Sequence, residues 1–375
     1  MAHQIVRRSA LLCGIGGFVC GLSRADDDGA AAVCAPMRER VSSLEARLSG
    51  LEVAAASRTH AAFVFIKPHA ADAAPVASLV RTALGAAGIA VRGEGVLGAA
   101  EMDAKRLIDT HYGAIASKAM RTDPRDLNPT PAARALFAST FAAELAGMGD
   151  GIGTWEEAVA AGRVRNAVGA CSELGIDAAA MDGRCRERMV KFGGGFYCSL
   201  VDGIFVINGF YMAMRAKYCA PGEKIRFLRA EWDADRLSWA DFRGATLGAT
   251  NPAAAAEGSL RRSIYDGWAD LGLGAQPSVG DNGVHASASP FEAMAERVNW
   301  LEQDLGTDVF GAGLLAAGIP EATVRAWMSD PQVPFEGGRQ SLFDLLEDLD
   351  ARDCLAKAKQ INAAAAAGGS SSQKL

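Results

Sequence analysis

Residues 282–289 read Asn-Gly-Val-His-Ala-Ser-Ala-Ser, and they join the end of a strand to the start of a helix. His285 lies in the strand-like segment 278–286. Ser289 then opens a Ser-Pro-Phe-Glu sequence, a capping box with proline at the first helical position, so a helix is predicted to run to about Leu305. A histidine at a strand end is usually structural, and it becomes a candidate for chemistry only when other motifs accompany it.

Short motifs that are weak one by one precede this stretch. The apolar run Phe63–Ile66 reads as a buried strand that ends at Lys67-Pro68. The other motifs are His111-Tyr112, Arg243 before the loop Leu247-Gly248-Ala249-Thr250-Asn251-Pro252, and Gly258-Ser259-Leu260-Arg261. Their order along the chain makes the set far more specific than any one member.

In this order and with these neighbours, the motifs resemble the nucleoside diphosphate kinase family. That family has an I-K-P strand end, an H-Y helix end, a G-x-T-N-P loop, a G-[ST]-[IL]-R segment and an N-x-x-H-[GA]-S segment with the active histidine. The resemblance covers about residues 60–120 and 223–305. It implies an α+β, ferredoxin-like core, in which a four-stranded antiparallel sheet carries helices on one face. It also implies a homo-oligomer, because family members are usually hexamers or tetramers.

The resemblance assigns the chemistry to His285. That residue would take the γ-phosphoryl group from one nucleoside triphosphate and hand it to a diphosphate in a ping-pong cycle. Glu296, on the following helix, matches the family glutamate that orients the histidine ring through its second nitrogen and fixes its tautomer. Imidazole suits this role because a large fraction of it is uncharged at neutral pH.

The nucleotide would be held by residues that the resemblance transfers one by one: Lys67, Tyr112, Arg243, Thr250, Arg261 and Asn282. Lysine and arginine supply the fixed positive charge and the fork-like donors that phosphoryl transfer asks for. The implied cofactor is Mg²⁺ with ATP or another nucleoside triphosphate. The ion would be held mainly by phosphates and water, and no Asp/Glu cluster for a protein metal site is evident in the sequence.

The sequence also departs from the family pattern. His69 stands where the family has an acidic residue, and Ala288 stands where it has aspartate. Arg243 lies one residue further from the G-x-T-N-P loop than the family spacing, which predicts a local shift of the backbone. The family's base-stacking phenylalanine is not recognisable, and Phe137 and Phe141 are open as replacements.

The segment 121–222 is longer than the family allows, so we predict a large insertion. Within it, Asp202-Gly203 between two apolar runs predicts a hairpin. Periodicity predicts further helices at 76–87, 99–112, 210–218, 235–247 and 341–359, and strands at 89–97 and 224–232. The predicted organisation is a targeting segment 1–25, a linker and short heptad helix 26–58, the kinase-like domain 59–305, a helical extension 306–362 and a disordered tail 363–375.

Residues 1–25 have the features of a targeting segment. Arg7 and Arg8 precede an apolar stretch at 9–22, and the small residues of 23–25 suit a signal peptidase. We expect an organelle or the secretory route, with a signal anchor or a disordered organelle presequence as alternatives and a cytoplasmic protein otherwise. No later run reaches 18 uninterrupted apolar residues, so the mature protein is not expected to be transmembrane.

Charge and cysteine content limit the function further. The formal net charge is −6, which gives no electrostatic footprint for nucleic acid, so no nucleic-acid partner is expected. Of the eight cysteines, Cys13 and Cys20 would leave with a cleaved presequence. The other six share no metal-like spacing, and they leave open a disulfide pair or buried thiols.

A heptad pattern precedes the kinase-like domain, at Met37, Val41, Leu44, Leu48 and Leu51. It is a short coiled-coil seam or an amphipathic helix. About two heptads are too few to be stable alone. The segment would therefore either assist oligomerisation or dock on the domain.

Two functions follow from the resemblance, and the fold alone does not separate them. The first is an enzyme, a phosphotransferase between nucleoside triphosphates and diphosphates. The second is a catalytically weak or inactive nucleotide-binding scaffold in a larger assembly, which the insertion, His69 and Ala288 favour. A histidine phosphatase or a protein phosphotransferase that uses the same histidine is a third option without positive support.

Overall fold

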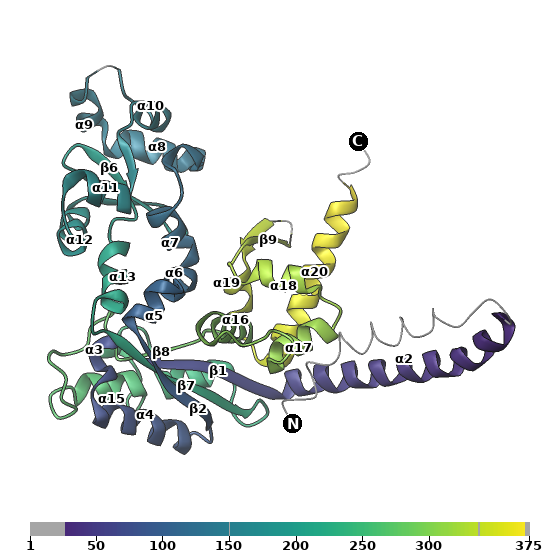
Figure 1. Ribbon diagram of the computed structural model, residues 1–375. Coiled ribbons are helices and arrows are strands. Elements are labelled where there is room, and N and C mark those ends of the chain that lie inside the picture. The colour runs from purple at the N-terminus through teal and green to yellow at the C-terminus, as the bar shows by residue number, and fades with distance from the viewer. Residues whose placement is uncertain (1–26, 150, 337, 372–375) are drawn as a thin grey trace.

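The structure is a computed structural model, and it describes residues 27–149, 151–336 and 338–371 (Figure 1). The fold is mixed α+β, and its central sheet has four antiparallel strands in the order β2-β7-β1-β8. These strands are β1 (Thr59–Ile66), β2 (Ala90–Gly98), β7 (Lys224–Asp233) and β8 (Val284–Ala286). Strands from both ends of the predicted kinase-like domain therefore meet in one sheet.

Helices cover both faces of this sheet. They are α3 (Pro68–Ala71), α4 (Ala74–Ala86), α5 (Ala99–Ala104), α6 (Leu107–His111), α15 (Leu260–Asp266) and α16 (Pro290–Leu301). Successive side chains of a strand point to opposite faces, so Val64 and Ile66 pack with α4 and α15, while Phe63 and Phe65 pack with α5, α6 and α16. The sequence predicted helices on one face of the sheet only, and the structure differs. The face of β1 that carries Phe63 and Phe65 is also apolar, so it needs helices to bury it as well.

The insertion forms a second body at the top of Figure 1, beyond α7 (Gly113–Met120). Its own four-stranded sheet has the order β3-β6-β5-β4. The strands are β3 (Val164–Asn166), β4 (Met189–Gly193), β5 (Phe196–Val201) and β6 (Ile204–Ile207), and the helices are α8 (Pro131–Thr140), α9 (Ala142–Gly147), α10 (Trp155–Ala160), α11 (Ala167–Leu174), α12 (Ala178–Glu187) and α13 (Tyr211–Cys219). The insertion thus has a sheet and a core of its own.

Two features of the insertion bear on the sequence predictions. Asp202 and Gly203 have positive φ values of 48° and 79°, which suits the two-residue hairpin predicted there. Phe137 and Phe141 are fully buried in the core of the insertion. The hypothesis that either phenylalanine stacks on a nucleotide base is therefore wrong, because both rings are enclosed by other side chains of that core.

The C-terminal extension mixes helices with a short hairpin. Its elements are α17 (Val309–Ala316), α18 (Glu321–Trp327), β9 (Gln332–Phe335), β10 (Gly338–Ser341), α19 (Leu342–Leu346) and α20 (Ala351–Ser371). The predicted helix 341–359 is interrupted at 347–350, where Asp348 has a positive φ of 57°. In the segment predicted as a disordered tail, α20 continues through 363–371 with an alanine-rich sequence.

The N-terminal arm is the single long helix α2 (Asp27–Arg58), which projects from the body (Figure 1). The residues 27–36, predicted as linker, are helical. Near its C-terminal end α2 lies against α17, where a Cβ on Gly313 would come within 2.2 Å of the Cβ of Ala56. The missing side chain at Gly313 therefore permits this close helix contact.

Several predicted elements have other boundaries in the structure. The predicted helix 99–112 is divided by Arg106, which has a φ of 55°. The predicted helix 235–247 is reduced to α14 (Trp239–Asp241) and the π-helical turn η3 (Phe242–Leu247). β8 is also shorter than the predicted strand 278–286. Tertiary packing overrides local pattern at these places.

The targeting segment 1–25 lies outside the described residues. Of the helices described, none combines the length and the apolar character that crossing a bilayer requires. Among the described side chains, free thiols are found at Cys171, Cys185, Cys198, Cys219 and Cys354.

Candidate active site

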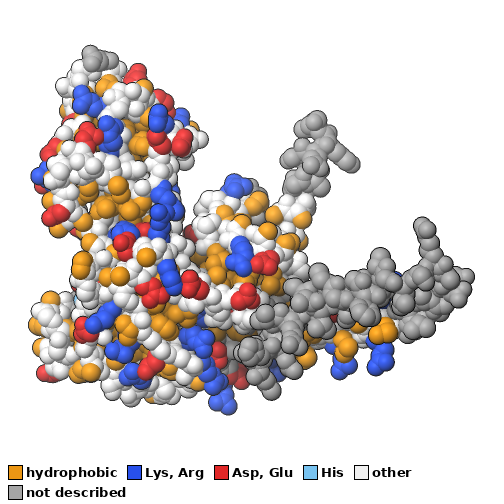
Figure 2. All heavy atoms as spheres, viewed as in Figure 1, with side chains coloured by type: hydrophobic (Ala, Val, Ile, Leu, Met, Phe, Trp, Pro, Cys, Tyr) orange, Lys and Arg blue, Asp and Glu red, His pale blue; other side chains and the backbone are white. Residues whose placement is uncertain are grey.

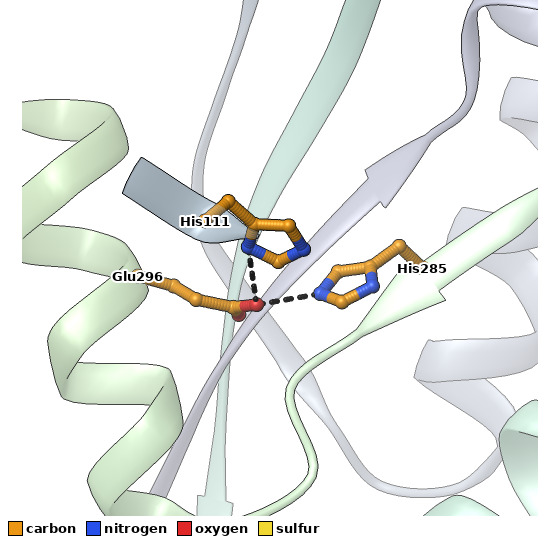
Figure 3. Close-up of side chains that lie close together, drawn as sticks. All are labelled: His111, His285 and Glu296. Atoms are coloured by element: carbon orange, nitrogen blue, oxygen red, sulfur yellow. Dashed lines mark hydrogen bonds and ion pairs between the residues drawn. The ribbon is translucent and has the colours of Figure 1, made fainter. Parts of the chain in front are cut away.

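Three side chains from different elements meet beside the central sheet (Figure 3). Nε2 of His285, on β8, lies 2.6 Å from Oε1 of Glu296, on α16. Nδ1 of His111, the last residue of α6, lies 3.3 Å from the same oxygen. The hydroxyl of Ser287 contacts the other carboxylate oxygen, Oε2. The buried carboxylate of Glu296 is therefore engaged through both of its oxygens.

The sheet register sets the position of His285. β8 pairs with β1 so that His285 stands opposite Phe65, and the two rings stack with their centroids 4.5 Å apart. Phe65 is fully buried, so it fixes one face of the imidazole against the core. In Figure 3 the other ring nitrogen of His285, Nδ1, is turned away from the carboxylate. That nitrogen is the one left for chemistry.

The turn between β8 and α16 is held by the polar contacts at the helix start. Oγ of Ser289 accepts a hydrogen bond from the backbone N–H of Glu292 at 3.1 Å, as an N-cap does. The carboxylate of Glu292 accepts from the N–H of Ala288 at 2.8 Å, one residue before the N–H that a capping box uses. Burial raises the pKa of Glu292, and the nearby charge of Glu296 raises it further.

The environment keeps both histidines uncharged near neutral pH. Burial lowers the pKa of His285 well below its ordinary value, and the charges of Lys67, Arg261 and Arg243 add to the shift. Burial also lowers the pKa of His111 to about 4. In the neutral ring, the N–H at Nε2 of His285 donates to the carboxylate of Glu296. The other nitrogen, Nδ1, is then unprotonated.

Lys67 and Arg261 bring two buried positive charges to the site. Nζ of Lys67 donates to the carbonyl of Gly280 at 2.9 Å, and the guanidinium of Arg261 donates to the carbonyls of Val284 at 3.0 Å and Gly248 at 2.9 Å. Burial lowers the pKa of Lys67 to about 8 and that of Arg261 to about 10. Within residues 27–149, 151–336 and 338–371, neither cation has a carboxylate at ion-pair distance. Buried cations in this state favour an anion as ligand.

The offset of Arg243 in the sequence has a local structural explanation. Arg243 lies in the π-helical turn η3, and the N–H of Gly248 donates to its carbonyl at 3.0 Å. A π turn takes up one residue more than an α-helical turn, which accommodates the extra residue. The side chain of Arg243 donates to Glu347 at 2.7 Å and to Asp348 at 2.6 Å, both from the C-terminal extension.

Asn282 links the two loops that the sequence placed near the nucleotide. Its Nδ2 donates to the carbonyl of Thr250 at 2.9 Å, while the side chain of Thr250 is exposed. Asn282 is 1% exposed, and its Oδ1 has no hydrogen-bond partner among the described residues. A buried acceptor without a donor costs free energy, and an ordered water or a ligand hydroxyl would each satisfy it.

A cavity of about 480 Å³ opens beside these residues. Lys67, Tyr112 and Thr250 line it from the central domain. The insertion supplies the facing wall with Asp182, Arg186, Phe210, Met214, Lys217 and Tyr218. Its volume falls within the usual range of small-molecule sites. The insertion is therefore part of the pocket and not a separate appendage.

His111, His285 and Glu296 are also a set that could bind a metal ion. Their ligand atoms lie within 4.8 Å of one another, and imidazole and carboxylate are common zinc ligands. The two short contacts from ring nitrogens to one carboxylate oxygen already account for the arrangement as hydrogen bonds. A metal ion bound there would occupy Nε2 of His285, the nitrogen through which Glu296 orients the ring.

Of the predicted site residues, Lys67, Tyr112 and Thr250 line the cavity. His285 and Glu296 are in direct contact, and the ring of Tyr112 packs edge-on against His111 with centroids 4.6 Å apart. Lys67, Arg243 and Arg261 act on His285 through their charges, and Asn282 and Thr250 are bonded to each other. The roles assigned to these residues are still predictions.

Sequence reasoning gave no role to several residues of the site. His111 and Ser287 stand inside the quoted H-Y and H-A-S motifs, so a signal for them was present. Glu347 and Asp348 lie in the C-terminal extension, and no motif marks them. Their contact with Arg243 comes from the tertiary fold alone.

Comparisons with known proteins place few constraints on the chain. No family model matches it, and no curated protein matches it. Among solved structures it is similar to an NDP kinase from Pyrobaculum aerophilum, with a TM-score of 0.31 and 15% sequence identity, over 64% of this chain and 95% of that chain. At that TM-score the likeness establishes neither fold nor activity, so the function has to come from the residues of the site.

Proposed function

We propose that the protein is a nucleoside diphosphate kinase-like phosphotransferase that works through a phosphorylated His285. One observation carries the proposal: a neutral, core-stacked imidazole is held by Glu296 through Nε2, next to two buried cations without carboxylate partners among the described residues. A histidine in a merely structural role would not need the charges of Lys67 and Arg261 beside it. A phosphate group supplies the negative charge that both cations lack.

The reaction would proceed in two mirrored steps. Nδ1 of His285 forms a nitrogen–phosphorus bond to the γ-phosphorus, the bond from that phosphorus to the bridging β–γ oxygen breaks, and the nucleoside diphosphate leaves with the bonding pair. A second diphosphate then attacks the phosphohistidine through its terminal oxygen and restores the neutral ring. Glu296 stabilises the positive charge that the ring gains in each step.

The charges of the pocket fit a nucleotide with its magnesium ion. Lys67 and Lys217 line the cavity and Arg261 acts on Lys67 through its charge, so these three would face the phosphates, while Asp281 is the carboxylate close to Lys67. Such a donor set suits Mg²⁺ held through phosphates and water, with at most one protein oxygen from Asp281. The ion neutralises phosphate charge when bound.

The proposed kinase would have a ferredoxin-like core and contacts to the sugar and the base of the nucleotide. The strand order β2-β7-β1-β8 supports a ferredoxin-like core in the segments 59–120 and 223–305. The unpartnered Oδ1 of Asn282 supports sugar recognition. The cavity wall from the insertion would take the place of the family's base-stacking phenylalanine, with Phe210 and Met214 as its apolar members.

The test is transfer of label from γ-labelled ATP with magnesium. The full chain should form an acid-labile, alkali-stable phosphoprotein that passes its label to added GDP, and His285→Ala should form none while it still binds nucleotide. His111→Ala is the matched control, because His111 contacts the same carboxylate as His285. In this variant His285 should still become labelled. A folded, nucleotide-binding wild type without label would refute the kinase.

The second candidate, a nucleotide-binding scaffold of weak or no activity, is favoured by a separate observation. Arg243 is paired with Glu347 and Asp348, so it is already occupied by carboxylates. Nucleotide binding without any label in the test above would support this function.

A further inference from the structure

The arm helix α2 carries an apolar stripe that the rest of the described chain does not cover. Met37, Val41, Leu44, Leu48 and Leu51 are all exposed, and Leu44 and Leu51 reach 60% and 68%. Figure 2 shows apolar side chains between basic ones along this projecting arm. A row of large exposed apolar side chains at heptad spacing marks an interaction surface.

The stripe does not serve the contact between the arm and its own body. That contact uses Val53 and Ala56, which pack on the core of the C-terminal extension. On a helix of 3.6 residues per turn these residues lie on a different face from Leu44, Leu48 and Leu51. Of the two roles left open by the sequence, docking on the domain is therefore filled by other residues of α2.

The charged residues beside the stripe would be complementary between two parallel copies of α2. With Val41 and Leu48 as a positions and Leu44 as d, Arg40 is a g position and Glu45 is the following e position. In a parallel pair of α2 helices, Arg40 of one copy faces Glu45 of the other. In an antiparallel pair g positions face g positions, which would oppose Arg40 to Arg47.

We propose that α2 pairs with α2 of a second copy of this chain as a parallel two-stranded coiled coil through the stripe 37–51. The short length does not exclude this pairing. Each helix is already formed and anchored on its body by the close Ala56–Gly313 contact, so association does not have to order it first. β-branched valine at one a position and leucine at d favour two strands.

The experiment measures the dissociation constant of the full-length protein by analytical ultracentrifugation. Leu44→Asp should weaken self-association by about tenfold or more, because two carboxylates would enter the seam. Ala46→Asp is the matched control, since Ala46 lies on the opposite face of the same turn and is exposed. It introduces the same charge and should leave the dissociation constant unchanged.

Charge reversal tests the partner and the orientation. Arg40→Glu alone and Glu45→Arg alone should each weaken self-association several-fold, because like charges then face each other. An equal mixture of the two variants should recover association as a heterodimer, which only the parallel register allows. An unaltered dissociation constant in Leu44→Asp, or no recovery in the mixture, would overturn the proposal and point to another segment or another protein on the stripe.

Discussion

Nη1 of Arg243 lies 2.6 Å from Oδ1 of Asp348. This contact joins a guanidinium of the central domain, close enough to His285 to lower its pKa, to a loop of the C-terminal extension. Glu347 adds a second carboxylate to the same nitrogen at 2.7 Å. A nucleotide phosphate that binds Arg243 has to compete with both carboxylates.

Removing this competition should increase nucleotide affinity. In Glu347→Gln with Asp348→Asn we expect the Kd for a nucleoside triphosphate to fall by roughly two- to fivefold, the range of partly exposed ion pairs. Isothermal titration calorimetry at low and high salt measures the change. Glu321→Gln removes an ion pair with Arg325 in the same extension and serves as control. An unchanged Kd in the double variant would show that Arg243 does not contact the nucleotide.

The Glu296–His285 contact predicts a loss of phosphorylation rate without loss of nucleotide binding. Glu296→Gln should slow labelling of His285 by about 10- to 100-fold, as for other residues that orient a reactive imidazole. Rapid-quench labelling separates this rate from the Kd. Glu302→Gln, at the exposed end of the same helix, is the control. Equal labelling rates in wild type and Glu296→Gln would contradict the orienting role.

Because of Lys67, nucleotide binding should weaken at alkaline pH; the rise in Kd above about pH 7 is the alkaline limb of the binding curve. The pKa of Lys67 is lowered to about 8, first by burial and then by the charge of Arg261, so the amine loses its proton as the pH rises through about 8. Because phosphate binds the protonated amine, the Kd should rise between about pH 7 and pH 9.

Lys67→Arg should remove this limb, because a guanidinium keeps its proton over the whole range. Lys217→Arg is the control, since Lys217 lines the same cavity and is paired with Asp281 at 2.6 Å. The measurement is the Kd of the nucleotide against pH for each variant. If the limb persists in Lys67→Arg, another group is responsible for it.

The unpartnered Oδ1 of Asn282 predicts selectivity for a sugar hydroxyl. Two ATP analogues, one without the 2′ hydroxyl and one without the 3′ hydroxyl, test this contact. The analogue that lacks the hydroxyl donating to Oδ1 should bind the wild type about five- to tenfold more weakly than ATP does. In Asn282→Ala this difference between ATP and the analogue should vanish. A hydroxyl preference that survives the substitution would assign its recognition to another residue.

The loop whose carbonyl at Gly248 accepts from Arg261 should tolerate no side chain at that position. The φ of Gly248 is +90°, and an added Cβ would come within 2.4 Å of Oγ of Ser259. Gly248→Ala should therefore lower the free energy of unfolding by about 2–3 kcal/mol, measured by urea denaturation. Gly244→Ala, where an added Cβ would meet no atom within 4 Å, should be close to neutral. Similar losses in both variants would contradict a local steric cause.

The local pattern of the sequence determined much of this protein. Apolar runs and turn residues predicted β1, the hairpin at Asp202-Gly203, β7 and the cap of α16, because strands, turns and caps depend on neighbours in the chain. The order of the motifs along the chain also indicated His285, Glu296 and Lys67 as site residues. The strands, the turn and the cap depend on atoms within a few residues of one another, whereas the candidate site residues came from the order of short motifs along the chain.

Only the tertiary structure decided what depends on contacts between distant segments. The enclosed rings of Phe137 and Phe141, the wall that the insertion adds to the cavity, and the pairing of Arg243 with Glu347 and Asp348 join residues far apart in the chain. The π turn at Arg243 and the uncovered stripe of α2 belong to the same class. Packing, burial and long-range electrostatics set these features, and no local pattern encodes which distant side chain will be the neighbour.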